Sequence, residues 1–322
     1  MNGFKSIYAL LLQEYINFKQ SLGYKFELGN GLQGIDFFFS SVGSTHIGVT
    51  RSESDQWCSK RPNETDVNRY KRSSQLRNFS RFLNDIGYES YVPRLPKNIP
   101  STYTPHIFTK DEMMRLFSAC DQIDAYHPNS TYRFCYPVFI RILSSTGLRK
   151  SEAIALTIRD VDLDQGTMLI REPKNERDRL LPFSSSLLTV LKEYSEHFNV
   201  GAEGWQPFLR QLDGKILNGD STYRIFRKSL KFAGIPHGGR KQGPCLHCLR
   251  HSFACASLAK MAEEGLDLYY CLPILSKYLG HASLEATEGY VRMTENVYPG
   301  IIADLNQVCP SIFPEVTHEE SN

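Results

Sequence analysis

The stretch Leu279-Gly-His-Ala-Ser-Leu-Glu-Ala-Thr-Glu-Gly-Tyr290 places a helix end, a histidine and a tyrosine close together in sequence. Gly280 is typical of a helix C-terminus, and Ser283 is suited to cap a following short helix that carries Tyr290. His281 precedes the tyrosine by nine residues. The pattern therefore predicts a short helix that presents Tyr290 after a helix end and a histidine.

Three further motifs supply cationic side chains. Thr146-Gly-Leu-Arg-Lys-Ser-Glu152 contains Arg149, a basic hairpin before Arg179-Leu-Leu-Pro182 contains Lys174, and His247-Cys-Leu-Arg-His251 contains His247 and Arg250. Attack on a phosphodiester requires neutralisation of the non-bridging oxygens, an activated nucleophile and a protonated leaving oxygen. Arginine suits the first task because its planar fork donates two hydrogen bonds and stays charged. The set indicates phosphoryl chemistry with a tyrosine nucleophile.

Prolines recur at short intervals between the two halves of the chain, at Pro93, Pro96, Pro100 and Pro105. This spacing prevents a helix and favours an extended linker. The sequence Thr109-Lys-Asp-Glu112 that follows is a capping box and predicts a helix start. We therefore expect an N-terminal helical domain at 1–92, a Pro-rich linker at 93–108, a second domain at 109–300 and a C-terminal helix and tail at 301–322.

The expected fold class is mainly α with a small antiparallel β-sheet. Apolar residues at helical spacing predict two helices before the linker, around 7–18 and over 65–86. After it, helices are predicted at 134–145, 151–156, 185–198, 221–233, 249–263 and 273–279. A turn at 161–166 separates them from a hairpin of strands 167–170 and 179–183, with Lys174 near its tip.

Taken together, the four motifs resemble those of the tyrosine recombinases of the phage integrase family, and the resemblance covers essentially the whole chain. It implies an N-terminal core-binding domain of SAM-like fold and a catalytic domain, which together form a clamp on DNA. It also implies that Tyr290 attacks the scissile phosphate to give a 3′-phosphotyrosyl bond and a free 5′-hydroxyl. Arg149 and Arg250 would bind the non-bridging oxygens.

The resemblance assigns the remaining roles by position. Lys174 would protonate the departing 5′-oxygen, His247 would assist proton transfer, His281 would hydrogen-bond the phosphate, and Glu152 would orient the site. No metal, ATP or other cofactor is implied, because the phosphotyrosine keeps the bond energy. Two features depart from the common pattern: the Lys174 hairpin lacks flanking glycines, and His251 offers an alternative proton acceptor.

Positive charge is concentrated where DNA contacts are expected. Residues 1–98 carry 13 lysines and arginines against nine acidic residues, although the whole chain is near neutral at +2. Two predicted helices bear basic clusters that suit phosphate contact. The candidate DNA-binding residues are Arg69, Lys71, Arg72 and Arg77 in the first helix, and Arg224, Arg227 and Lys228 in the second.

Composition indicates a globular protein with a core, because 41% of the residues are hydrophobic. No apolar run is long enough for a membrane span and the N-terminus lacks a signal-peptide pattern, so we expect a cytoplasmic, nucleoid-associated protein. Cys245 and Cys248 form a Cys-x-x-Cys around His247. A zinc-dependent DNA-binding module built on this pair is one alternative, although no second ligand pair has zinc spacing.

The expected function is site-specific recombination or integration on double-stranded DNA, by a homotetramer that exchanges strands through a Holliday junction. A mobile element, either a transposon or a phage, is the expected setting, and an accessory protein is a further candidate partner. Plasmid or chromosome dimer resolution, a type IB topoisomerase-like reaction and a non-catalytic DNA-binding accessory factor are the alternatives. The segment after Tyr290 is expected to pack on a neighbouring protomer, with packing in cis as the alternative.

Overall fold

The computed structural model describes residues 3–24, 31–97, 104–128, 130–171, 178–239, 243–281, 287 and 289–291. The chain divides into two compact units, residues 1–102 and 103–322, and each is described by itself. No helix among these residues combines the length and the apolar character that crossing a membrane requires. The predicted fold class, mainly α with a small antiparallel sheet, is confirmed.

The first unit is helical and has an aromatic core. The rings of Tyr8 and Phe39 lie 4.5 Å apart, and Phe79 meets Tyr8 edge-on at 5.7 Å. Such contacts stabilise a core beyond the burial of area alone. Two of its helices were not predicted individually, α2 and α3, whereas the basic helix α4 begins one residue after its predicted start. The helices are α1 (Ala9–Ser21), α2 (Leu32–Val42), α3 (Arg51–Cys58) and α4 (Asp66–Asp85).

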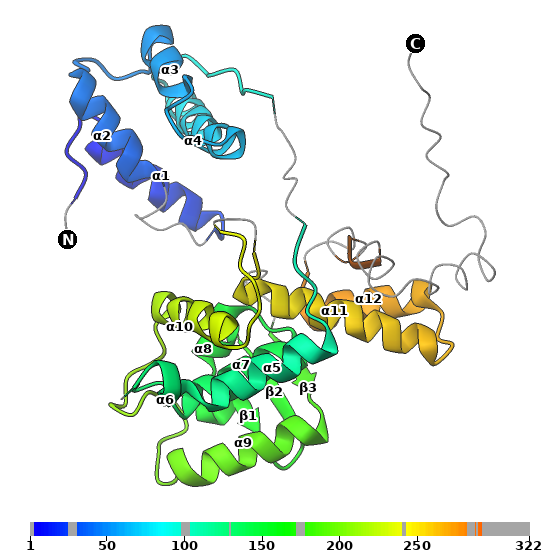
Figure 1. The fold of residues 1–322 in the computed structure, drawn as a ribbon. Helices are drawn as coiled ribbons and strands as arrows, with labels where there is room; N and C mark the ends of the chain where they lie inside the picture. The colour runs from blue at the N-terminus through cyan, green and yellow to red at the C-terminus, as the bar shows by residue number, and fades with distance from the viewer. Residues whose placement is uncertain are drawn as a thin grey trace, which may run out of the picture. The chain divides into compact units, whose positions relative to one another are not determined.

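The second unit is built around the buried helix α7 (Cys135–Thr146), which packs against α5 (Lys110–Asp121), α9 (Ser185–Phe198) and α11 (Leu246–Glu263) (Figure 1). Helix α5 begins after Thr109, whose side chain and Glu112 form the predicted capping box. Shorter elements complete the frame: α6 (Ile123–Tyr126), α8 (Lys150–Ala155), the 3-10 helix η1 (Ile158–Asp160) and α10 (Gly219–Phe232).

The sheet has three antiparallel strands in the order β1 (Val161–Asp162), β2 (Thr167–Ile170) and β3 (Arg179–Pro182). Met168 pairs with Val161 on one side and with Leu181 on the other. The expectation of a turn over 161–166 was therefore wrong at its first two residues, which form a strand. The hairpin tip lies outside the described residues, so Lys174 is not placed.

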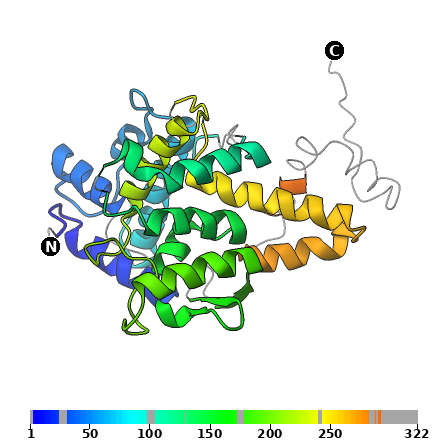
Figure 2. The same cartoon turned by 60° about the horizontal axis from the view of Figure 1, so that its bottom comes forward.

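Helices α11 and α12 (Leu268–Leu279) run side by side (Figures 1 and 2). The predicted start of α12 at Pro273 was wrong, because the helix begins at Leu268 and holds the proline inside it. Helix α12 ends at Leu279, and Gly280 then adopts a φ of +70°, which glycine takes without strain. His281 directly follows this turn.

Candidate active site

Arg149 lies at the start of α8, directly after a tight turn. Helix α7 ends at Gly147, whose φ is +63°, and a Cβ at this position would lie only 2.6 Å from Cδ1 of Phe253. The turn therefore requires glycine. Glu152 then accepts both the backbone N–H of Arg149 at 2.8 Å and its Nη1 at 2.7 Å. Glu152 therefore holds both the backbone and the side chain of Arg149.

Arg250 is buried, with only 1% of its surface exposed. Its Nη1 donates to the carbonyl of Gly147 and its Nη2 donates to that of Leu279, both at 2.7 Å. These carbonyls belong to the ends of α7 and α12, where helices lack internal partners and favour cations. Burial, followed by the charge of Arg149, lowers the pKa of Arg250 to about 10, so the guanidinium remains charged at neutral pH.

Three histidines lie beside these arginines and are held neutral. Burial, reinforced by nearby positive charge, lowers the pKa of His247 and brings those of His251 and His281 to about 4. Nδ1 of His281 lies 2.8 Å from the hydroxyl of Thr287, whereas Nδ1 of His251 is buried without a hydrogen-bond partner. Neutral imidazoles can accept a proton, which is what a phenol nucleophile requires.

Tyr290 is packed among these rings with 3% of its surface exposed. Its ring stacks on His281 at 5.9 Å between centroids, and the ring of His251 lies 5.4 Å away. Burial raises the pKa of Tyr290, while the charge of Arg250 and a hydrogen bond with it act in the opposite direction. The net rise means that the phenol is protonated at neutral pH and needs a proton acceptor to attack.

The described part of the chain thus brings together six of the seven residues singled out for catalysis, and Lys174 lies outside it. The six are Arg149, Glu152, His247, Arg250, His281 and Tyr290. Two cations close to Lys174 in sequence are engaged elsewhere: Lys150 donates to the carbonyl of Gly219 at 3.2 Å, and Arg171 pairs with Asp160. Arg179 also belongs to this cluster, because it pairs with Glu152, and its place in the sequence did not indicate this.

The model of the phage integrase family matches residues 106–296, which is more than half of the chain. The chain belongs to the phage integrase family. Integrase/recombinase y4rB of Sinorhizobium fredii is 29% identical over 297 residues, covering 89% of this chain and 93% of its own. The tyrosine recombinase XerA of Pyrococcus furiosus is 31% identical over 216 residues, covering 66% of this chain and 64% of its own. The enzyme is therefore a tyrosine-type site-specific recombinase.

A solved structure of a lambda integrase tetramer bound to a Holliday junction shares the fold. Its TM-score is 0.56 at 14% identity, and the match covers 89% of this chain and 78% of that one. At this level of identity the likeness concerns the fold alone. Which residues of the present chain act on DNA has to be argued from its own side chains.

The candidate DNA-binding residues differ in how free their charges are. On α10 the side chains of Arg224, Arg227 and Lys228 are exposed. On α4 Lys71 is exposed, but Arg69 donates to the carbonyl of Cys58 at 2.9 Å. Arg77 likewise donates to the carbonyl of Pro93 at 2.7 Å. These internal bonds do not test phosphate contact, which stays a prediction for all seven.

Arg72 is the most deeply engaged of these side chains. It makes a two-pronged pair with Glu64, at 2.9 Å from Nε and 2.7 Å from Nη2, with both side chains only 10% exposed. Its guanidinium also lies 5.2 Å from the ring of Trp57. We expect Arg72→Ala to destabilise the first unit by about 3 kcal/mol, because it leaves a buried carboxylate unpaired.

Lys71 provides the contrasting prediction. We expect Lys71→Ala to leave stability unchanged and to lower the slope of log affinity against log salt by about 0.9, as the loss of one phosphate contact does. Denaturant unfolding and salt-dependent binding, measured on both variants, separate structural from DNA-contacting basic residues. An unchanged slope for Lys71→Ala, and also for Arg69→Ala and Arg72→Ala, would remove α4 from the DNA interface.

The zinc alternative is not supported by the arrangement of ligands. The thiols of Cys245 and Cys248 lie 3.6 Å apart at the start of α11, and Cys248 is fully buried in the hydrophobic core. Among the residues that the structure describes, no three histidine, cysteine, aspartate or glutamate side chains are grouped so that they could hold a metal ion. Structural zinc requires four such ligands.

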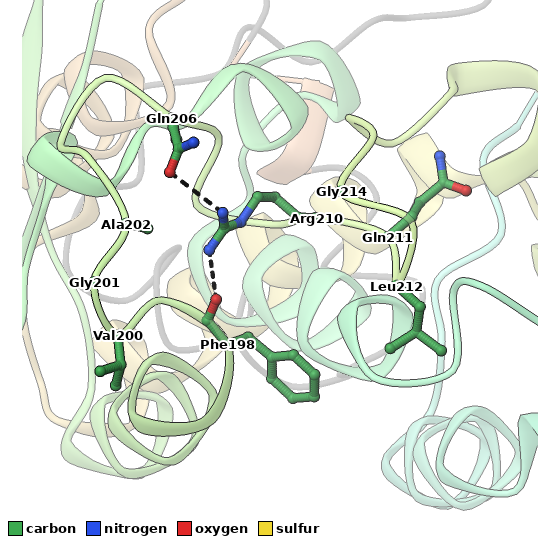
Figure 3. Close-up of a pocket in the computed structure, with 9 residues that line it drawn as sticks. All are labelled: Phe198, Val200, Gly201, Ala202, Gln206, Arg210, Gln211, Leu212 and Gly214. Atoms are coloured by element: carbon green, nitrogen blue, oxygen red, sulfur yellow. Dashed lines mark hydrogen bonds between the residues drawn. The ribbon is translucent and has the colours of Figure 1, made fainter.

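A pocket of about 440 Å³ lies apart from these residues, around the segment that follows α9 (Figure 3). Arg210 crosses it, donating to the side chain of Gln206 at 3.3 Å and to the carbonyl of Phe198. Its lining contains none of the candidate catalytic residues. A recombinase acts on an extended duplex, so a small pocket is not required for its substrate.

The neutral histidines predict how stability responds to acid. In the unfolded chain the histidine side chains take up protons near pH 6.5. In the folded protein the pKa values of His251 and His281 are lowered to about 4. Their contribution to stability is complete above pH 6.5 and is lost progressively as the pH falls toward 4. We expect His251→Phe, which keeps a ring against Tyr290, to make the fall in unfolding free energy between pH 7 and 5 shallower. Equal slopes for both proteins would contradict the assignment.

Proposed function

We propose that this recombinase cuts and rejoins double-stranded DNA through a 3′-phosphotyrosyl intermediate and a Holliday junction, in the service of a mobile element. The observation that carries the proposal is the position of Tyr290, hydrogen-bonded with Arg250 and packed between His281 and His251. A phenol, a fixed cation and neutral imidazoles are the groups that attack on a phosphodiester needs.

In this proposal Tyr290 attacks the phosphorus and forms a phosphotyrosyl bond as the bond to the 5′-oxygen breaks. Arg149 and Arg250 donate to the non-bridging oxygens through the N–H groups that their internal bonds leave over. A neutral histidine, either His247 or His251, takes the phenolic proton, and His281 hydrogen-bonds the phosphate. Burial of the arginines strengthens their effect on the negative transition state, because little water screens them.

Lys174 is proposed to protonate the departing 5′-oxygen. We expect Lys174→Ala to slow cleavage of ordinary DNA by about 10²–10⁴-fold, the usual contribution of a general acid. A substrate with sulfur at the 5′-bridging position should restore the rate, because a thiolate leaves without protonation. Single-turnover cleavage of the two substrates measures the effect, and a variant that stays equally slow on both would remove Lys174 from the acid role.

The proposed assembly is a homotetramer on two synapsed sites, in which the units 1–92 and 109–300 grip DNA as a clamp and strands are exchanged in pairs. It is supported by family membership and by the fold shared with the lambda integrase tetramer on a Holliday junction. The proposed setting inside the cell is the cytoplasm, at the nucleoid. The predicted C-terminal helix, at 301–322, lies outside the described residues.

The reaction products distinguish this proposal from its alternatives. We would incubate the protein with a supercoiled plasmid that carries two copies of DNA flanking its gene, and with a matched plasmid that carries none. Recombinant circles that appear with the two-site plasmid alone support site-specific recombination. Relaxation of both plasmids without recombinants supports a topoisomerase, and tight binding without any strand cleavage supports an accessory factor.

A further inference from the structure

Arg179, the first residue of β3, reaches into the candidate active site with its side chain 10% exposed. Its Nη1 and Nη2 donate to the two carboxylate oxygens of Glu152 at 3.1 and 2.8 Å. Its Nε donates to the carbonyl of Tyr278 at 3.0 Å. All three nitrogens of the guanidinium therefore donate to protein acceptors.

Glu152 is saturated by two arginines. A carboxylate offers about four acceptor positions, and here they receive Nη1 of Arg149, the backbone N–H of Arg149 and the two nitrogens of Arg179. The side chain of Glu152 is only 7% exposed. Burial by itself would raise its pKa, but the bonds and charges of Arg179 and Arg149 outweigh burial and hold the pKa below its usual range.

The same two arginines also hold the end of α12. Arg149 donates from Nη2 to the carbonyl of Gly280 at 2.8 Å, and Arg179 donates to that of Tyr278. There is little room at this contact, since a Cβ on Gly280 would lie 3.0 Å from Nη1 of Arg179. Carbonyls at a helix C-terminus lack internal partners and favour cations. Arg179 thus links β3 and the start of α8 to the turn that leads into His281.

We propose that Arg179 is a positioning residue, which holds Glu152 ionised and oriented so that Arg149 is fixed for its phosphate. This inference rests on the proposed function, and it assigns Arg179 no contact with DNA. Without Arg179, Glu152 would lose the two hydrogen bonds that orient its carboxylate toward Arg149. The guanidinium of Arg149 would then be less firmly oriented. The phosphate would be bound by a mobile cation.

The groups that act electrostatically on Glu152 are Arg149, Arg179, Arg250 and His247. Burial, and then the charges of Arg250 and Arg149, hold the pKa of His247 below its usual range. Loss of Arg179 removes an opposite charge and two hydrogen bonds, so Glu152 should protonate at higher pH. The positioning role therefore predicts a change in the pH profile, which loss of packing alone does not.

The test is single-turnover cleavage by wild type, Arg179→Gln and Arg179→Lys, with suicide DNA at a saturating concentration, from pH 4 to 8. We expect Arg179→Gln to cleave about 10–100-fold more slowly at pH 7, which is the usual effect of removing a residue that orients a directly acting group. The pH at which its cleavage rate falls on the acid side, the acid limb of the profile, should be higher by about one unit. Arg179→Lys keeps the charge, so its acid limb should stay near that of wild type. In a Glu152→Gln background, Arg179→Gln should shift nothing further.

Arg141→Gln is the control, because Arg141 on α7 makes a two-pronged pair with Asp121 at the end of α5, at 2.7 and 2.8 Å, away from the candidate site. It should leave the profile unchanged. Titration of ¹³C-labelled glutamate without DNA gives a second readout, in which Arg179→Gln should raise the midpoint of Glu152. An unmoved acid limb or an unmoved midpoint overturns the inference, even if the wild type cleaves. A wild type that never attaches to DNA contradicts the proposed function instead.

Discussion

Tyr290→Phe is expected to lose covalent attachment to DNA, with cleavage at least about 10⁴-fold below wild type. Phenylalanine keeps the ring that stacks on His281 and contacts His251, so the fold should be unaffected. Only the attacking oxygen is removed. The measurement is the yield of denaturation-resistant protein–DNA adduct on a nicked suicide duplex, with DNA affinity measured in parallel.

Tyr194→Phe provides the matched control for this variant. Tyr194 is also buried, at 4% exposure against 3% for Tyr290, and its hydroxyl contacts the backbone of Arg210 rather than the candidate site. It should cleave as wild type does. An adduct that persists in Tyr290→Phe would place the nucleophile on another tyrosine.

Arg250→Ala is expected to lower both the stability of the second unit and the rate of cleavage, and the two effects can be measured separately. The carbonyls of Gly147 and Leu279 lose their donor in a buried setting, at about 1–3 kcal/mol each, so the second unit should be destabilised by about 2–6 kcal/mol. The transition state loses a fixed cation, which should slow cleavage by about 10²–10³-fold even where the protein remains folded. Urea unfolding and single-turnover cleavage measure the two effects.

Arg250→Lys separates stability from catalysis. The ammonium keeps the charge but cannot reproduce the planar fork that spans two helix ends. We expect a folded protein whose DNA affinity is close to that of wild type and whose cleavage remains about 10-fold or more slower. Cleavage at the wild-type rate would show that charge alone suffices, and would contradict the role given to the fork.

The sequence could indicate which residues lie together around Tyr290, because phosphoryl chemistry restricts the residue type. Only a few side chains can neutralise a phosphate or attack it, and these fall in short motifs whose glycines mark the turns. Gly147 and Gly280 both adopt positive φ values beside a candidate catalytic residue. Sequence reasoning of this kind works where local backbone geometry and chemistry coincide.

Arg179 escaped notice because its partner is 27 residues away and its role depends on packing between β3, α8 and α12. A basic residue beside Lys174 had no distinguishing local signal. Arg72 has a partner that the sequence did not indicate, because a basic helix face does not reveal that Glu64, before the helix, pairs with it. Partners set by tertiary structure decide whether a cation is available.

Element boundaries were least predictable where local signals were ambiguous. A helix was expected from Pro273 to Leu279, but α12 begins five residues earlier at Leu268 and holds the proline inside it. The two residues of β1 were assigned to a turn because the turn signal immediately follows them. In both cases, α12 and β1, the element includes residues beyond those that the local sequence signals indicated.

The most direct test of the central claim is to map the covalent bond in the wild-type protein. The adduct formed on a suicide duplex would be digested with protease and nuclease, and the nucleotide-bearing peptide would be sequenced by mass spectrometry. The account predicts a 3′-phosphonucleotide on the peptide that contains Tyr290, with a free 5′-hydroxyl on the released strand. A nucleotide on any other residue, or a 5′-phosphate linkage, would contradict it.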